Sequence, residues 1–135
     1  MANLQSARNA LEHFEAHLGL ESSLRHLAEG LDYLDEVLAS KSAESEIANN
    51  IGRTYFNKTS EFIKRKLEGG AETEPALEVL YRTVIEFEGY EFGDKEQLSK
   101  LKRDTFTQLF NSYYQGYTQE EKKKAIQEIL NEIST

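Results

Sequence analysis

The sequence predicts an all-α fold, in which a single domain spanning residues 1–135 forms a bundle of about six helices. Apolar residues recur three and four positions apart along most of the chain, which is the spacing of a helix with one buried face. The chain has one proline, and its eight glycines fall mostly between the periodic segments, where helices end. Signals for strands are weak. A chain of 135 residues can also bury a core without a disulfide or a structural metal.

The first 40 residues predict an antiparallel helical hairpin. The first helix follows from apolar residues spaced 3-4-3-4, namely Leu4, Ala7, Leu11, Phe14 and Leu18. The second follows from leucines spaced 4-3-4-3-4, namely Leu20, Leu24, Leu27, Leu31, Leu34 and Leu38. The phase breaks at Gly19, which indicates a tight connection. Tyr33 and Val37 lie outside this seam, so a homodimer through the hairpin, about a twofold axis, is an open alternative.

The segment of about residues 43–68 predicts a third helix at the centre of the bundle. Its apolar residues cover close to half of the helical circumference, and polar residues such as Arg53 and Lys64 hold the other side. A wide apolar arc indicates contact with more than one neighbouring helix. Ala48 and Gly52 are small and lie four residues apart within this arc, so we expect another backbone to approach the helix closely there.

Turn and capping residues delimit the remaining three helices. Gly69 and Gly70 end the central helix, and Thr73 is expected to cap the fourth helix, with Pro75 in its first turn. A connection at residues 89–93 follows the fourth helix. Two capping-box pairs then open the fifth and sixth helices, namely Asp94 with Gln97 and Thr118 with Glu121.

The composition argues against several classes of partner and cofactor. The 16 Lys and Arg residues against 24 Asp and Glu give a net charge of −8, which disfavours binding to nucleic acid and to anionic membranes. Without cysteine, the chain has no disulfide, no thiolate nucleophile and no Cys-ligated metal. Neither a signal peptide nor a membrane-spanning stretch is visible, and the mean hydropathy is −0.64. We therefore expect a cytoplasmic protein with no cofactor, no nucleic-acid partner and no membrane contact.

Candidate catalytic and metal-binding motifs are weak. His13 and His17 lie four residues apart, a spacing that lets two side chains share a metal, but Phe14 stands where zinc proteases have a glutamate. Both histidines lie away from the apolar seam, so we expect solvated surface residues. The sequence holds no phosphate-binding loop, dinucleotide fingerprint or hydrolase nucleophile elbow. We therefore assign no catalytic and no metal-ligating residue.

Acidic and aromatic residues alternate at the end of the fourth predicted helix. Glu86, Glu88, Glu91 and Asp94 interleave with Phe87, Tyr90 and Phe92. One interpretation is a loop that docks a basic partner or holds calcium weakly, although the spacing is not that of an EF-hand. The other is a solvated connection whose aromatic side chains fold back onto the core.

Residues 105–119 form the most unusual segment, because these fifteen residues carry no charge in a chain that is 30% charged. On a helix, Phe106, Phe110, Tyr113 and Tyr117 would fall within about 60° of one another, with Tyr114 at the edge. Tyrosine enrichment and charge depletion are typical of protein interfaces. They also fit a buried helix whose hydroxyl groups reach the rim, or a small-molecule pocket. We expect Phe106 and Phe110 to be buried in either case, and Tyr114 to be exposed in an interface.

These features favour a non-catalytic interaction domain, with an adaptor or regulatory role, that binds a protein partner. The residues expected to contact that partner are Tyr113, Tyr114, Tyr117, Tyr90 and Phe92. A second class stays open: a helical bundle that binds a small ligand or a metal, which includes an enzyme, with its site near the tyrosine-rich segment 105–117. A closed apolar interior favours the interaction domain, whereas a cavity of roughly a few hundred Å³ with several polar groups favours the ligand site.

Overall fold

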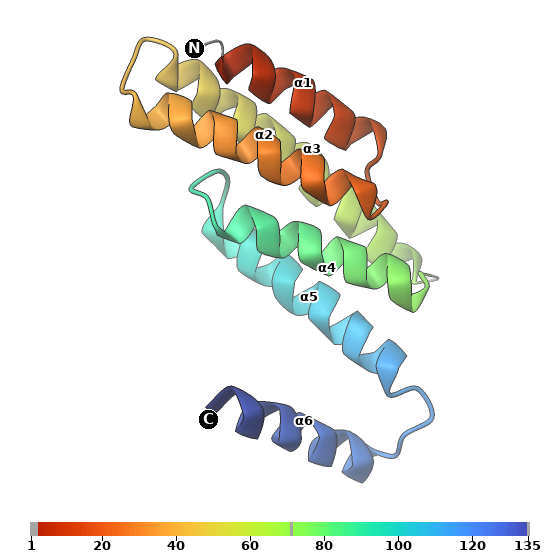
Figure 1. The fold of residues 1–135 in the computed structure, drawn as a ribbon. Helices are drawn as coiled ribbons and strands as arrows, with labels where there is room; N and C mark the ends of the chain where they lie inside the picture. Colours follow the sequence, from red (N-terminus) through yellow and green to blue (C-terminus); the bar gives the residue numbers. More distant parts are fainter. Residues whose placement is uncertain (1–2, 71, 135) are drawn as a thin grey trace.

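A computed structural model describes residues 3–70 and 72–134, and these residues form six helices (Figure 1). The predicted all-α class is confirmed. The helices in chain order are α1 (Asn3–Ala16), α2 (Ser22–Ala39), α3 (Ser45–Gly69), α4 (Glu74–Glu88), α5 (Lys95–Tyr113) and α6 (Gln119–Ser134). Helices α1 to α5 pack into one bundle, and α6 lies away from it.

Helices α1 and α2 form the predicted antiparallel hairpin. Leu11 of α1 packs against α2 at Gly30, where a Cβ atom would overlap the leucine side chain. The apolar seam that predicted the two helices supplies their buried side chains, with Phe14 and Leu31 among those that are almost fully inaccessible. The chain reverses at residues 17–21, as the phase break at Gly19 indicates.

Helix α3 packs against more than one helix, as its wide apolar arc predicts. It packs along α2 and α5, and Phe56 meets Phe87 of α4 edge to face, with ring centroids 5.4 Å apart. Helix α2 packs against three helices, α1, α3 and α4 (Figure 1), so the sequence did not predict which helix has the most neighbours. The two hairpins of the bundle, α1–α2 and α4–α5, are therefore joined through α2 and α3 together.

Side-chain caps begin the last three helices where the sequence predicts them. Thr73 Oγ1 accepts a hydrogen bond from the Ala76 amide at 3.4 Å, and Asp94 Oδ1 accepts one from the Glu96 amide at 2.8 Å. A reciprocal capping box opens α6. The Glu121 amide donates to Thr118 Oγ1 at 3.2 Å, and the Thr118 amide donates to Glu121 Oε1 at 3.1 Å.

The two residues that suggested a homodimer through residues 1–40 do not lie on the outside of the hairpin α1–α2. Val37 is buried, and Tyr33 is half-buried against the core. Both residues were expected to face water or a second subunit. That expectation is wrong because α3 and α4 pack against the other side of α2 and cover it.

The small residues of α3 admit an aromatic ring rather than a second backbone. A Cβ atom at Gly52 would overlap the ring of Phe92, which contacts the helix at this point. Ala48, one turn earlier, is fully buried. The close approach is therefore confirmed, but the group that approaches is the side chain of the loop between α4 and α5.

We expect Gly52→Ala to lower the free energy of unfolding by about 1 kcal/mol. The added methyl group overlaps a fully buried ring, and overpacking of a core costs about 1–3 kcal/mol. Better helix propensity of alanine offsets roughly 1 kcal/mol of this cost. Gly69→Ala in the same helix is the control, because nothing lies within 4 Å of its added methyl group, and it should be neutral or stabilising. Urea unfolding of both variants measures the difference, and equal curves would contradict the packing described.

Candidate functional site

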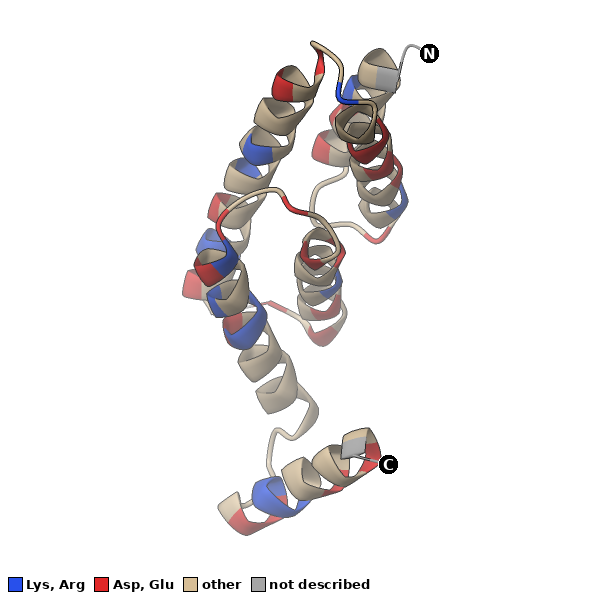
Figure 2. Ribbon diagram, turned by 90° about the vertical axis from the view of Figure 1, so that its left-hand side faces the viewer, with Lys and Arg blue, Asp and Glu red and all other residues tan. Residues whose placement is uncertain are grey.

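The charge-free segment 105–119 is not one helix. Helix α5 ends at Tyr113, Tyr114 is its C-cap, and Gly116 turns the chain with a φ of +89°. Tyr117 therefore lies in the turn that leads to α6, and the predicted shared helical face of Phe106 and Tyr117 is wrong. In Figure 2 the C-terminal end of α5 carries no acidic or basic residue, while charges reappear in α6.

The aromatic face of α5 points away from the bundle. Phe106 is 44% exposed and Phe110 is half-buried, so the expectation that both are core residues is wrong. Helix α5 is rotated so that a different face packs against the bundle. That face supplies the buried residues of the helix, namely Leu98, Leu101, Thr105 and Leu109. Tyr114 is half-buried rather than exposed, and its ring centroid lies 4.6 Å from that of Phe110.

A continuous row of aromatic rings crosses this surface from α4 to the start of α6. Neighbouring ring centroids are 6.0 Å apart for Tyr81 and Phe106, 6.2 Å for Phe106 and Phe110, and 5.0 Å for Tyr114 and Tyr117. We call these rings the aromatic row, which consists of Tyr81, Phe106, Phe110, Tyr114 and Tyr117. Pairs at these distances attract one another, so the row is a stable, semi-exposed strip of apolar surface.

Tyr113 is not one of the rings of the aromatic row. Its ring is about half exposed. Burial, followed by the carboxylates of Glu78 and Glu74, raises the pKa of Tyr113 above its ordinary value. The hydroxyl therefore lies near the first turns of α4 and stays protonated at neutral pH.

Helix α6 faces the aromatic row with an apolar stripe. Ala125 is buried and Ile129 is half-buried, while Ile126 is 44% and Ile133 is 76% exposed. Between this stripe and α5 runs an open groove of about 640 Å³, which we call the α5–α6 groove. It is lined by Phe106, Thr107, Phe110, Asn111, Gln119, Lys122, Lys123, Ile126, Ile129, Leu130 and Ile133. Most of this lining is apolar, and its charged members are lysines.

The sequence contained a signal for this stripe that we did not use for the site. The apolar residues of α6 recur at the spacing of an amphipathic helix. Together with the charge-free segment before it, the stripe indicates that apolar surface continues from α5 into α6. Sequence alone does not say whether such a stripe meets its own chain or another one.

The predicted site residues Tyr90 and Phe92 lie elsewhere, at the junction of α2, α3 and the loop before α5. Phe92 is only 1% exposed, so its side chain offers no surface to a partner. Tyr90 is half-buried, and its hydroxyl donates a hydrogen bond to Asp32 Oδ1. Burial and this carboxylate raise the pKa of Tyr90 above its ordinary value. Of the two interpretations of the acidic–aromatic loop, the structure supports the one in which the rings fold back onto the core.

The three histidines form a stacked cluster that the sequence reading missed. The ring centroid of His26 lies 5.2 Å from that of His13 and 5.9 Å from that of His17. An antiparallel hairpin brings residue 26 beside residues 13 and 17, so the register of α1 and α2 was the available signal. Among residues 3–70 and 72–134, no group of three or more His, Cys, Asp or Glu side chains is arranged to hold a metal ion.

Acidic pH should weaken the fold through this cluster. Burial, then the charges of Arg25, His13 and His17, lower the pKa of His26 from its ordinary 6.5, and Glu29 opposes them. The folded state therefore prefers the neutral ring, and its contribution is lost as the pH falls through 6.5 and then through the lowered pKa. Between about pH 7.5 and pH 5, the melting temperature should fall less for His26→Gln than for the wild type. An equal fall in both proteins would contradict this.

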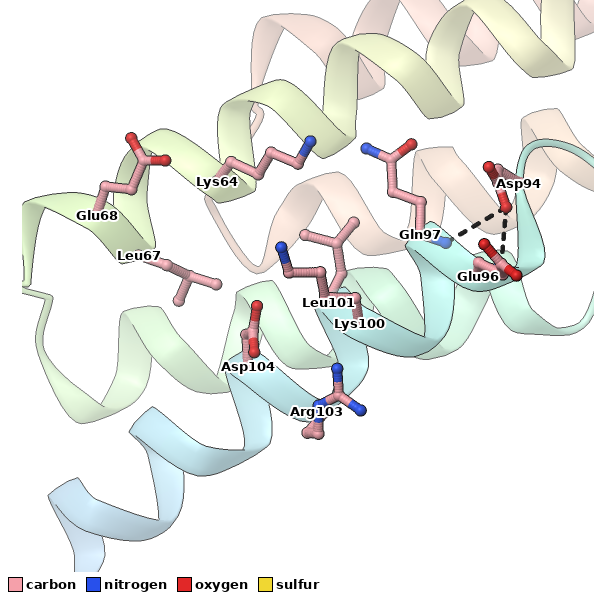
Figure 3. A pocket seen from close by; sticks show the side chains of 10 residues that line it. All are labelled: Lys64, Leu67, Glu68, Asp94, Glu96, Gln97, Lys100, Leu101, Arg103 and Asp104. Atoms are coloured by element: carbon pink, nitrogen blue, oxygen red, sulfur yellow. Dashed lines mark hydrogen bonds between the residues drawn. The ribbon is translucent and has the colours of Figure 1, made fainter.

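A second groove, of about 640 Å³, lies between α3 and α5, and most of the residues that line it are charged or polar (Figure 3). Lys64 and Gln97 extend toward each other across it, and Asp94 caps α5 at one end through the Glu96 amide. The charged side chains that line it are of both signs, namely Lys64, Glu68, Asp94, Glu96, Lys100, Arg103 and Asp104. Because cations and carboxylates alternate, the groove selects neither anions nor cations, and its lining holds no nucleophile paired with a base.

No helix in the described part of the chain is both long and apolar enough to cross a membrane. Comparisons with protein-family models, with curated proteins and with solved structures give no match. A function for the chain is therefore inferred from its own surfaces, and the aromatic row with the α5–α6 groove is the most distinctive of these.

Proposed function

We propose that the chain is a non-catalytic helical interaction domain that binds a protein partner through the aromatic row and the α5–α6 groove. We call these two features together the docking face. The observation that carries the proposal is the distribution of exposed apolar side chains. In the described residues nine large apolar side chains are exposed, and five of them belong to the docking face, namely Phe106, Tyr117, Ile126, Leu130 and Ile133.

The physical argument is the cost of leaving this face in water. Burying apolar surface contributes roughly 25 cal/mol per Å², and soluble monomers rarely expose contiguous apolar patches beyond a few hundred Å². A row of contacting rings beside an isoleucine-rich stripe concentrates such surface at one end of the molecule. A partner that covers the face would recover this free energy.

The shape of the docking face favours a helix as its ligand. Two helices, α5 and α6, supply the walls of an elongated apolar groove, and amphipathic helices insert their apolar face into grooves of this kind. Lys122 and Lys123 lie at its edge. An amphipathic helix with carboxylates beside its apolar stripe would therefore fit both the shape and the charge of the groove.

The alternative of a small-ligand site is less well supported. Pockets for small molecules commonly bury about 70–90% of the ligand surface. The α5–α6 groove is instead bounded by side chains that remain open to solvent, with Ile133 exposed most. We also propose that the protein acts in the cytoplasm and does not bind nucleic acid, which its cysteine-free composition and net charge of −8 favour.

Site-specific photocrosslinking in the native cell tests the proposal. A benzophenone amino acid at Ile126, on the docking face, should form an adduct with one defined protein species, and a second copy of the chain counts as such a species. The same probe at Ile47, on α3, is a matched control, because Ile47 and Ile126 are 43% and 44% exposed. Adducts of equal yield and identity from both positions, or none from Ile126, would contradict the proposal.

A further inference from the structure

We infer that the docking face binds a second copy of this chain, with the α5 and α6 helices of two copies packed about a twofold axis. This inference rests on the proposed function, and it names the partner. In a twofold dimer each copy contributes the same surface, so one self-complementary face is sufficient. The two α6 helices would then lie antiparallel to each other. Each α6 would pack between the α6 and the α5 of the other copy.

The distribution of charge permits two copies to meet at this end of the molecule. Residues 1–40 carry two basic and seven acidic groups, and residues 71–93 carry one and six. By contrast, residues 94–135 carry seven of each. The excess negative charge therefore lies in α1, α2 and α4, away from the docking face. Repulsion between the two copies is weakest where we place the contact.

Charge within α6 favours the antiparallel arrangement. Its N-terminal half holds Lys122, Lys123 and Lys124 beside Glu120 and Glu121, a net charge of +1, while its C-terminal half holds Glu128 and Glu132, a net charge of −2. An antiparallel second α6 brings the net positive half of one copy beside the net negative half of the other. A parallel arrangement would place halves of like charge together, which costs free energy.

The apolar stripe of α6 also has the width that two neighbours require. Ile126, Ile129 and Ile133 step 3-4, which is the seam of a packed helix pair. In the antiparallel register Ile126 of one copy lies beside Ile129 of the other. Ala125 and Leu130 widen the stripe to about 140° at 3.6 residues per turn. A stripe of this width contacts more than one helix, as each helix of a four-helix bundle does.

The absence of cysteine in the sequence gives a clean test. Gln127→Cys places one spin label per chain on the exposed side of α6, away from its apolar stripe. With one label on each 135-residue chain, dipolar coupling between labels arises only between copies. We expect a defined distribution of distances between the labels of two copies, and a sedimenting mass of twice 15.5 kDa. Adding Ile126→Glu, or Ile133→Glu as a second variant, should abolish the coupling and return the mass to 15.5 kDa, whereas Ile47→Glu should change neither.

A mass of 15.5 kDa without coupling at millimolar chain concentration would overturn this inference. So would coupling that survives both Ile126→Glu and Ile133→Glu. A doubly labelled chain, Thr107→Cys with Gln127→Cys, diluted into unlabelled protein, then reports on the proposed function. If the two labels keep the separation of the open groove, the docking face stays open to a different protein and the proposed function stands. If they move together, α6 closes onto α5, and the proposed function fails as well.

Discussion

Phe92→Ala is expected to lower the free energy of unfolding by about 3–5 kcal/mol, a large part of the 5–15 kcal/mol of a typical domain. Phe92 is 1% exposed, and its ring fills the space above Gly52 of α3. Removing the ring leaves a cavity at the junction of α3 with the loop before α5. The stacked contact with Tyr90, at 6.2 Å between ring centroids, is lost at the same time.

Phe106→Ala is the matched control, because the same atoms are removed from a side chain that is 44% exposed. Its loss should be about 1 kcal/mol, mainly from the ring contacts with Tyr81 and Phe110. Urea unfolding of both variants provides the comparison. A loss for Phe106→Ala as large as that for Phe92→Ala would mean that the aromatic row is core.

Gly93→Ala is expected to cost about 2–5 kcal/mol, for two separate reasons. Gly93 has a φ of +84°, a conformation that costs an L-residue about 1–2 kcal/mol. An added Cβ would also overlap the buried ring of Phe56, and overpacking adds about 1–3 kcal/mol. The position therefore requires glycine for both its backbone and its packing.

Gly116→Ala separates the backbone cost of Gly93→Ala from its packing cost. Gly116 has a similar φ of +89°, but nothing lies within 4 Å of an added methyl group. Only the backbone cost of about 1–2 kcal/mol should appear there. Equal losses at both glycines, measured by chemical unfolding, would show that Phe56 moves aside without cost.

The helices could be predicted from the sequence because their signals are local. Apolar spacing and capping residues such as Thr118 act within one or two turns, and the structure has helices where those signals lie. The hairpin of α1 and α2 followed in the same way from the phase break at Gly19. The close approach at Gly52 was also predicted, although the approaching group was not, because Phe92 comes from a distant loop.

The candidate site was harder to predict from the sequence, because its position depends on which faces of different helices pack against one another. Helical angles show that Phe106 and Phe110 share a face, but not which face of α5 turns toward the bundle. The sequence predicts the buried face of a helix from side-chain type alone, and it therefore predicts that the large aromatic residues of this segment face the core. Composition could not place Phe92 either, since the acidic loop around it resembles a solvated surface. The separation of α6 depends on a turn at Gly116 that no periodic pattern marks.

The stability of Ile126→Glu tests most directly whether the docking face is surface or core. At a chain concentration where the wild type sediments as a monomer, its free energy of unfolding should lie within about 0.5 kcal/mol of the wild-type value, as for a surface substitution. Ile47→Glu, with nearly equal exposure, should give the same result. A loss of several kcal/mol for Ile126→Glu alone would contradict the account, because it would show that α6 packs into the core of its own chain.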